Sequence, residues 1–91
     1  MSRGVKQQGF IYFLLSEKLD AVKIGFTRNN DMKVRLRDCQ TWSPHEYDVL
    51  KVVEGTMLEE RQLHRRFAKD KIRGEWFKYS EALKDYIFLL P

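Results

Sequence analysis

Five polar side chains that can take part in catalysis fall where the sequence pattern predicts an inward-facing or mixed surface: Tyr12, Lys23, Arg35, Glu60 and His64. A tyrosine, a lysine, an arginine and a carboxylate on one concave site would suit phosphodiester chemistry. Glu60 would bind a hard divalent cation through oxygen, and that cation would polarise the phosphate. Arg35 would neutralise the growing phosphate charge, while Tyr12 would position or deprotonate water. Because only one inward carboxylate is expected, a two-metal site is disfavoured.

Each of these side chains also has a purely structural interpretation, and the pattern alone leaves it open. Arg35 and Glu60 could form a partly buried ion pair, and His64 could be a hydrogen-bonded core histidine. Tyr12 could be a half-buried core residue, and Lys23 could extend its ammonium group to solvent. Burying isolated charges is costly, so the groups need each other, water, a metal or a ligand. The occurrence of all five in one short chain favours a functional site over separate structural roles.

A predicted hairpin positions Tyr12 and Lys23. Residues 9–16 and 21–27 are rich in β-branched and aromatic side chains, and the polar segment 17–20 joins them. With the turn centred on residues 17–18, Tyr12 lies opposite Lys23, and Phe13 lies opposite Val22. Alternation then makes one face wholly apolar and the other mixed. The mixed face includes Tyr12, Lys23, Gly25 and Thr27.

Helices are expected to position the other candidates. Residues 29–41 predict a helix, capped by Asn29 or Asn30, that carries Arg35 on its apolar stripe. A third strand is expected over 47–54 and is ended by Gly55. The Thr56 and Glu59 pair is a capping box that starts the next helix, with Glu60 and His64 on its inner stripe. Residues 73–80 predict a compact turn or short extended piece that packs Trp76 and Phe77, followed by a helix capped by Ser80.

These elements predict an α+β fold of order β-β-α-β-α-α, with a small three-stranded antiparallel sheet flanked by helices. The 91 residues suffice for one domain, 1–91, with a core over about 9–90. The longest apolar run is too short to cross a bilayer, and no apolar signal segment is visible, so no membrane role is expected. The single cysteine, Cys39, excludes an internal disulfide and favours a reducing, cytoplasmic setting.

Charge placement favours an anionic partner. The net charge is +4, and one acidic residue interrupts the basic run between residues 61 and 73. This run is either a solvated helix face or a stripe that follows phosphates. The candidate phosphate-binding residues there are Arg61, Arg65, Arg66 and Lys69, to which Lys23, Thr27 and Arg35 add the strand and the first helix.

The order of these residues resembles that of the GIY-YIG nuclease superfamily. The matching features are "FIY" (10–12), "KIG" (23–25), Thr27, Arg35 in a helix, "ExxLH" (60–64) and "GEWF" (74–77). The similarity is greatest to a small branch, common in phages, viruses and bacteria, that has "KIG" in place of "YIG". It runs from about residue 9 to 87, and the order and spacing are more specific than any single tripeptide.

The resemblance implies divalent-metal-dependent cleavage of DNA phosphodiesters, with Mg²⁺ or Mn²⁺ as cofactor. Tyr12 matches the tyrosine proposed as general base or water-orienting group, and Lys23 replaces the second tyrosine. Gly25 matches the glycine at which the backbone comes close to the active site. Arg35 matches the family arginine, and Glu60 matches the metal-binding glutamate. His64 follows Glu60 by one turn and could contact the same site.

Departures from the family pattern keep a second function open. The downstream asparagine of many members is absent, and Glu75 lies in roughly its place. The leading hypothesis is a DNA endonuclease. The alternatives are a nucleic-acid-binding module without cleavage and a protein-interaction domain in which Arg35 and Glu60 are structural. No separate targeting domain is expected within these 91 residues, so a protein partner could direct the cut.

Overall fold

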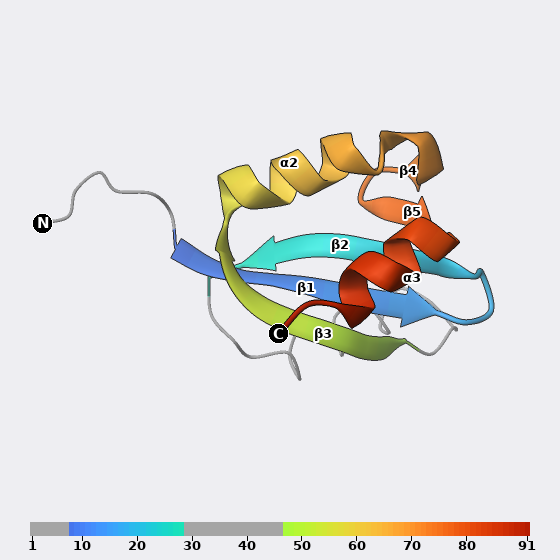
Figure 1. The fold of residues 1–91 in the computed structure, drawn as a ribbon, viewed down its shortest axis with the longest axis horizontal. Coiled ribbons are helices and arrows are strands. Elements are labelled where there is room, and N and C mark those ends of the chain that lie inside the picture. The colour runs from blue at the N-terminus through green and yellow to red at the C-terminus, as the bar shows by residue number, and fades with distance from the viewer. Residues whose placement is uncertain (1–7, 29–46) are drawn as a thin grey trace, which may run out of the picture.

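The computed structural model describes residues 8–28 and 47–91, which form an α+β fold (Figure 1). The predicted class is confirmed, and the helix expected over 29–41, with Arg35 and Cys39, lies outside the described residues. The elements are β1 Gln8–Ser16, β2 Ala21–Thr27, β3 Asp48–Thr56, α2 Met57–Arg66, the 3₁₀ turn η1 Ala68–Asp70, β4 Lys71–Arg73, β5 Trp76–Lys78 and α3 Glu81–Phe88.

The sheet has five strands in the order β3-β1-β2-β5-β4, and its pairings are antiparallel. The expectation of three strands was therefore wrong, because β4 and β5 occupy residues where a turn or extended piece was expected. Three-residue strands are too short to show an alternating pattern. The predicted end of the third strand was also wrong. Gly55 continues β3 and pairs with Gly9 of β1.

The β1–β2 hairpin differs from its predicted register by two residues. Tyr12 lies opposite Gly25, and Lys23 lies opposite Leu14. The loop has four residues, 17–20, and the Asp20 N–H donates to the Glu17 carbonyl at 3.2 Å. Asp20 has a φ of 52°, a left-handed conformation that its residue type does not predict. A two-residue shift keeps every side chain on its predicted face, so the apolar and mixed faces are as expected.

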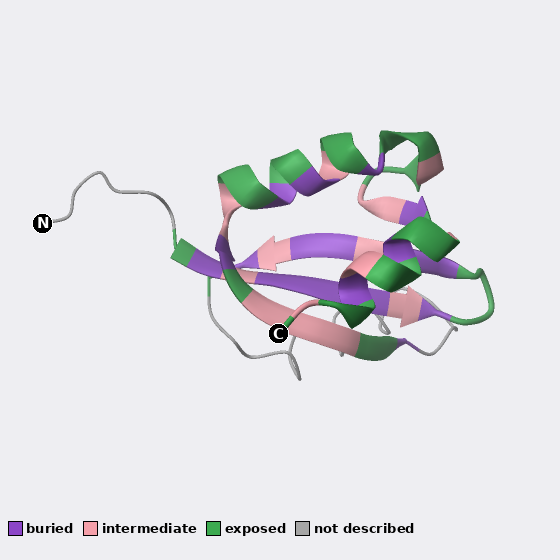
Figure 2. Ribbon diagram, viewed as in Figure 1, coloured by how far each residue is buried: buried purple, intermediate pink, exposed green. Residues whose placement is uncertain are grey.

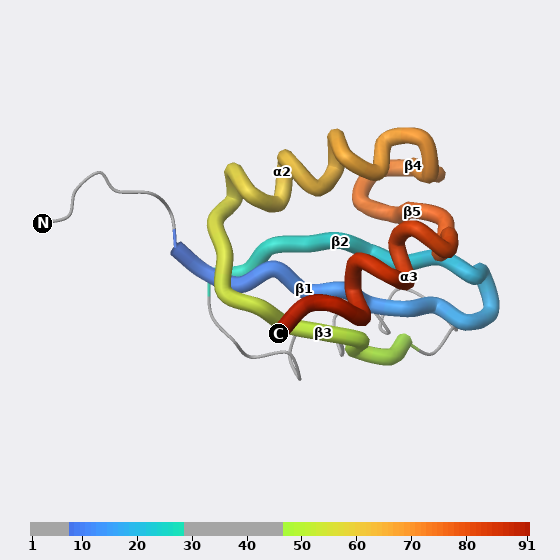
Figure 3. Tube along the Cα trace, in the orientation of Figure 1, coloured from blue at the N-terminus to red at the C-terminus, as the bar shows by residue number. Residues whose placement is uncertain are grey.

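Both described helices cover the apolar face of the sheet, as Figures 1 and 2 show. Phe13 and Ile24 contribute from the strands, Leu63 from α2 and Leu83 from α3. Phe77 of β5 is fully buried in the same cluster, so its predicted packing role is confirmed. Figure 3 traces the chain from α2 back along the sheet edge through β4 and β5 before α3. None of the helices within 8–28 and 47–91 could span a membrane.

The start of α2 is the local feature on which the position of Glu60 depends. The Thr56 hydroxyl accepts from the Glu59 N–H at 3.1 Å, and the Glu59 carboxylate accepts from the Thr56 N–H at 2.8 Å. The predicted capping box is confirmed. It fixes where the helix begins, and therefore which of its residues face the sheet.

Replacing Thr56 with alanine should destabilise the protein by about 1 kcal/mol, because the first turn loses its side-chain acceptor. Chemical denaturation of the wild type and the variant measures this difference. Thr56→Ser keeps the hydroxyl and should stay near the wild type. An alanine variant as stable as the serine variant would contradict the capping role.

Candidate functional site

Glu60 is the buried carboxylate of α2, with 7% of its surface exposed. Its Oε2 lies 3.7 Å from His64 Nε2, and among residues 8–28 and 47–91 it accepts no hydrogen bond. Burial raises the pKa of Glu60 above its ordinary value, and His64 opposes that rise. The negative charge of Glu75 raises the pKa further, while Arg61 lowers it. Glu60 thus lies between His64 and a second carboxylate, that of Glu75.

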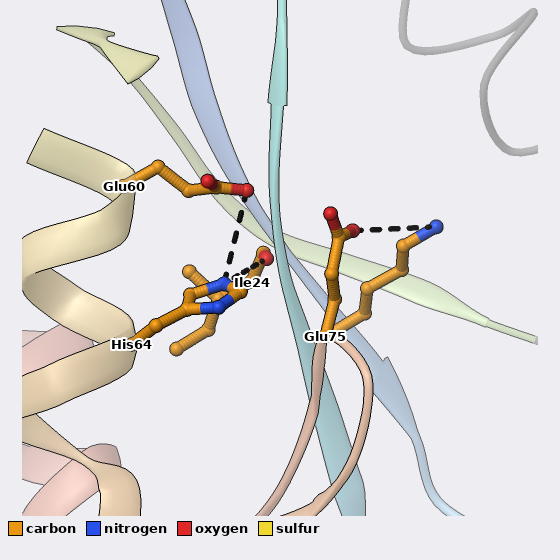
Figure 4. Close-up of polar contacts among 5 residues, drawn as sticks. Ile24, Glu60, His64 and Glu75 are labelled. Carbon is orange, nitrogen blue, oxygen red and sulfur yellow. Dashed lines mark hydrogen bonds and ion pairs between the residues drawn. The ribbon is translucent and has the colours of Figure 1, made fainter. Parts of the chain in front are cut away.

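His64 joins α2 to β2. Its Nε2 donates to the Ile24 carbonyl oxygen over 2.9 Å, and its ring lies edge-on to Phe77 with centroids 4.9 Å apart. The Ile24 N–H donates to the Glu75 carbonyl at 3.0 Å, so one strand residue holds both the helix and the β4–β5 turn. This contact agrees with the interpretation of His64 as a hydrogen-bonded core histidine. The same side chain also lies next to Glu60 (Figure 4).

Replacing His64 with alanine should lower the stability by about 1–3 kcal/mol, because the Ile24 carbonyl loses its donor in a partly buried place. A urea titration measures the loss. Gln62→Ala, on an exposed position of the same helix, serves as control and should change stability by less than about 0.5 kcal/mol. Equal midpoints for His64→Ala and wild type would show that the contact does not hold α2 to β2.

Lys23 and Glu75 form a second polar pair beside β2, with Lys23 on the mixed face of the sheet and Glu60 on the helix that covers the apolar face. Lys23 Nζ lies 3.9 Å from Glu75 Oε1 and 5.9 Å from the centroid of the Tyr12 ring. Figure 4 shows Glu75 across β2 from Glu60 and His64. The Lys23 side chain is 24% exposed and that of Glu75 is 44% exposed, so the pair is accessible. Glu75 is not among the predicted site residues, although its position in "GEWF" was a signal for it.

Tyr12 is buried on the mixed face, with 2% of its surface exposed. A Cβ atom added to Gly25 would collide with Cζ and the hydroxyl of the Tyr12 ring. Glycine is thus required at position 25 because the tyrosine crosses over it. The space beside the Gly25 backbone is therefore occupied by the Tyr12 ring. Thr27, the other predicted contact on this strand, is 4% exposed, which leaves little of its side chain for a ligand.

The predicted basic stripe divides between two flanks of α2. At 100° per residue, Arg61 and Arg65 project on the flank of His64, and Arg66 projects on the opposite flank. The influence of Arg61 on the pKa of Glu60 agrees with that placement. The Arg66 guanidinium lies over the Tyr86 ring, 4.9 Å from its centroid. Lys69 is exposed in η1. Arg61 and Arg65 are therefore the helix cations on the Glu60 side.

A hollow of about 370 Å³ lies on the Arg66 flank, between α2, β3 and the end of α3. Its lining includes Val53, Gln62 and Tyr86, and does not include Glu60, His64 or Lys23.

A comparison with protein families finds a T5orf172 domain over residues 9–88. The chain belongs to the T5orf172 domain family. This family is associated with nuclease-like and DNA-binding functions. No curated protein matches the chain. No solved structure matches it either.

In this T5orf172 domain, the donors around Glu60 suit a cation that keeps most of its water. The described parts of the chain contain no cluster of three or more His, Cys, Asp or Glu side chains that could hold a metal. Mg²⁺ is usually bound through one or two carboxylates plus waters and substrate phosphates. A single carboxylate, with the negative charge of Glu75 near enough to raise its pKa, fits that mode of binding.

Proposed function

We propose that this T5orf172 domain is a divalent-metal-dependent DNA endonuclease of the GIY-YIG type, which hydrolyses phosphodiester bonds at Glu60. The observation that carries the proposal is the Glu60 carboxylate itself. It is mostly buried on α2, lies 3.7 Å from His64 Nε2 and is close enough to Glu75 for that carboxylate to raise its pKa. Burial raises the pKa of the Glu60 carboxyl, and a bound cation would offset the cost of its ionised form.

Glu60 would hold the metal, and Mg²⁺ or Mn²⁺ bound there would polarise the scissile phosphate. Lys23, beside Tyr12, would attract the phosphate once the anion competes with Glu75 for the ammonium group. Tyr12 would position or deprotonate the attacking water. Arg35, outside the described residues, would stabilise the phosphate charge, as the family resemblance implies. His64 would hold Glu60's helix against β2.

Nicking of supercoiled plasmid tests this proposal. Purified protein with Mg²⁺ should convert the plasmid to its open form, and EDTA should stop the reaction. Branched and single-stranded substrates in the same assay would show which DNA structure is preferred. Absence of product with either Mg²⁺ or Mn²⁺ on all three substrates would reject an endonuclease.

A nucleic-acid-binding module without cleavage is the second candidate. It is favoured by the ion pair that already engages Lys23, and by Glu75 lying in roughly the place of the family asparagine. This candidate predicts salt-sensitive DNA binding with no turnover under any divalent metal. Metal-dependent product that disappears in an Arg35→Ala variant would exclude it.

A further inference from the structure

The β4–β5 hairpin, at the edge of the sheet, has an exposed, positively charged outer strand and an inner strand with a buried phenylalanine. All three β4 residues are exposed, and Ile72 lies between the cationic Lys71 and Arg73. β5 is anchored beneath them, because Phe77 is fully buried and Trp76 packs against Tyr47 with ring centroids 5.7 Å apart. The two cations of β4 therefore lie on a strand whose partner, β5, is packed into the protein.

The pairing of β4 with β5 determines where each cation points. Lys71 pairs with Phe77 and Arg73 pairs with Trp76, so a bulge interrupts the register between the two cations. Directly opposed residues share a sheet face. Lys71 therefore projects on the helix-covered face with Phe77, and Arg73 projects on the other face with Trp76. A bulge commonly re-aims a side chain in this way.

The same register connects Arg73 to the candidate site. Trp76 pairs with Lys23 in β2, so Lys23, Trp76 and Arg73 form one row across three strands on the mixed face. Neighbouring strands lie about 4.8 Å apart, which puts the Lys23 and Arg73 backbones about 10 Å apart. Glu75, in the two-residue turn of this hairpin, supplies the carboxylate that faces Lys23. This row of residues runs from Lys23 in β2 to Arg73 in β4, the strand at the edge of the sheet.

We propose that the β4–β5 hairpin is a DNA-contacting element in which Arg73 binds the backbone next to the phosphate held at Lys23. The proposal takes DNA as partner and in that respect rests on the proposed function. Two cations on one sheet face, separated by an aromatic ring, complement the charge of a nucleic-acid backbone. The basic run that the sequence shows between residues 61 and 73 ends on this strand.

Fluorescence anisotropy with a labelled DNA duplex in EDTA, over a series of KCl concentrations, tests the proposal without cleavage. The slope of log K against log salt should decrease in magnitude by about one for Arg73→Gln. Arg73→Lys should keep the wild-type slope because the charge remains. Lys84→Gln removes the same charge from α3, on the helix-covered side of the sheet, and should leave the slope unchanged.

The proposal is overturned if Arg73→Gln keeps the wild-type slope, if Lys84→Gln lowers it equally, or if the wild type does not bind the duplex. Plasmid cleavage is measured separately. A lowered Arg73→Gln slope without cleavage by the wild type would support the hairpin and reject the nuclease. Cleavage by the wild type with an unchanged slope would reject the hairpin alone.

Discussion

Glutamine in place of Glu60 is expected to reduce Mg²⁺-dependent plasmid nicking about 1,000-fold. The change removes the anionic oxygen that would hold the metal, and metal polarisation of a phosphate is worth several kcal/mol, where about 1.4 kcal/mol corresponds to a factor of ten. Glutamine has nearly the same shape, so α2 and the His64 contact to Ile24 should remain in place. Initial nicking rates measured over a range of Mg²⁺ concentrations would show the loss.

Glu17→Gln is the matched control for this experiment. Glu17 is exposed in the β1–β2 turn, and the chemical change is the same. The control should cleave like the wild type. If Glu60→Gln and Glu17→Gln nick equally fast, the activity belongs to another site or to a contaminant.

Alanine in place of Gly25 should destabilise the domain by about 1–3 kcal/mol, because the added methyl collides with the Tyr12 ring. The ring cannot swing aside freely, since Tyr12 is almost fully buried. This cost outweighs the preference of a strand for alanine over glycine, which is about 0.5–1 kcal/mol. Thermal unfolding should show a Tm lower by at least about 4 °C. Nicking should fall as well, because the Tyr12 hydroxyl is displaced.

The cost of Gly25→Ala should depend on the tyrosine. In a Tyr12→Leu background the clash with the far end of the ring is absent, so the same change should cost clearly less than in the wild type. A double-mutant cycle measures the difference. Equal costs in both backgrounds would mean that the Tyr12 contact is not the reason for glycine at position 25.

Local sequence signals predicted the elements that they govern directly. The capping box of Thr56 and Glu59 fixed the start of α2, and with it the inward position of Glu60. Alternation of Val22, Ile24 and Phe26 predicted the bounds and the core face of β2. Ser80 likewise predicted α3, since its hydroxyl accepts from the Leu83 N–H. In each case the residues that determine the structure are close together in sequence.

Features that depend on pairing between distant segments could not be predicted from the sequence. The hairpin register follows from the left-handed Asp20, which is not a residue type reserved for that conformation. Glu75 meets Lys23 only because β5 pairs with β2, and three residues are too few to reveal such a strand. The role of Arg35 stays a prediction, since it lies outside the described residues.

The raised pKa of Glu60 has a consequence for stability that separates a ligand site from a structural one. A carboxyl whose pKa is higher in the folded state contributes stability below its unfolded pKa, and that contribution is lost as pH rises through the folded value. At neutral pH the ionised Glu60 therefore opposes folding. Glu60→Gln should be the more stable protein at neutral pH, and its advantage should shrink as acid protonates Glu60.

The most direct measurement of the central claim is the thermal unfolding of the wild type and Glu60→Gln at neutral pH, each in EDTA and in Mg²⁺. In EDTA the variant should melt at or above the wild-type temperature, and Mg²⁺ should raise the Tm of the wild type alone. A structural ion pair at Glu60 predicts the reverse, a loss of about 3–5 kcal/mol in the variant with no effect of Mg²⁺. That result would contradict a metal-binding role for Glu60.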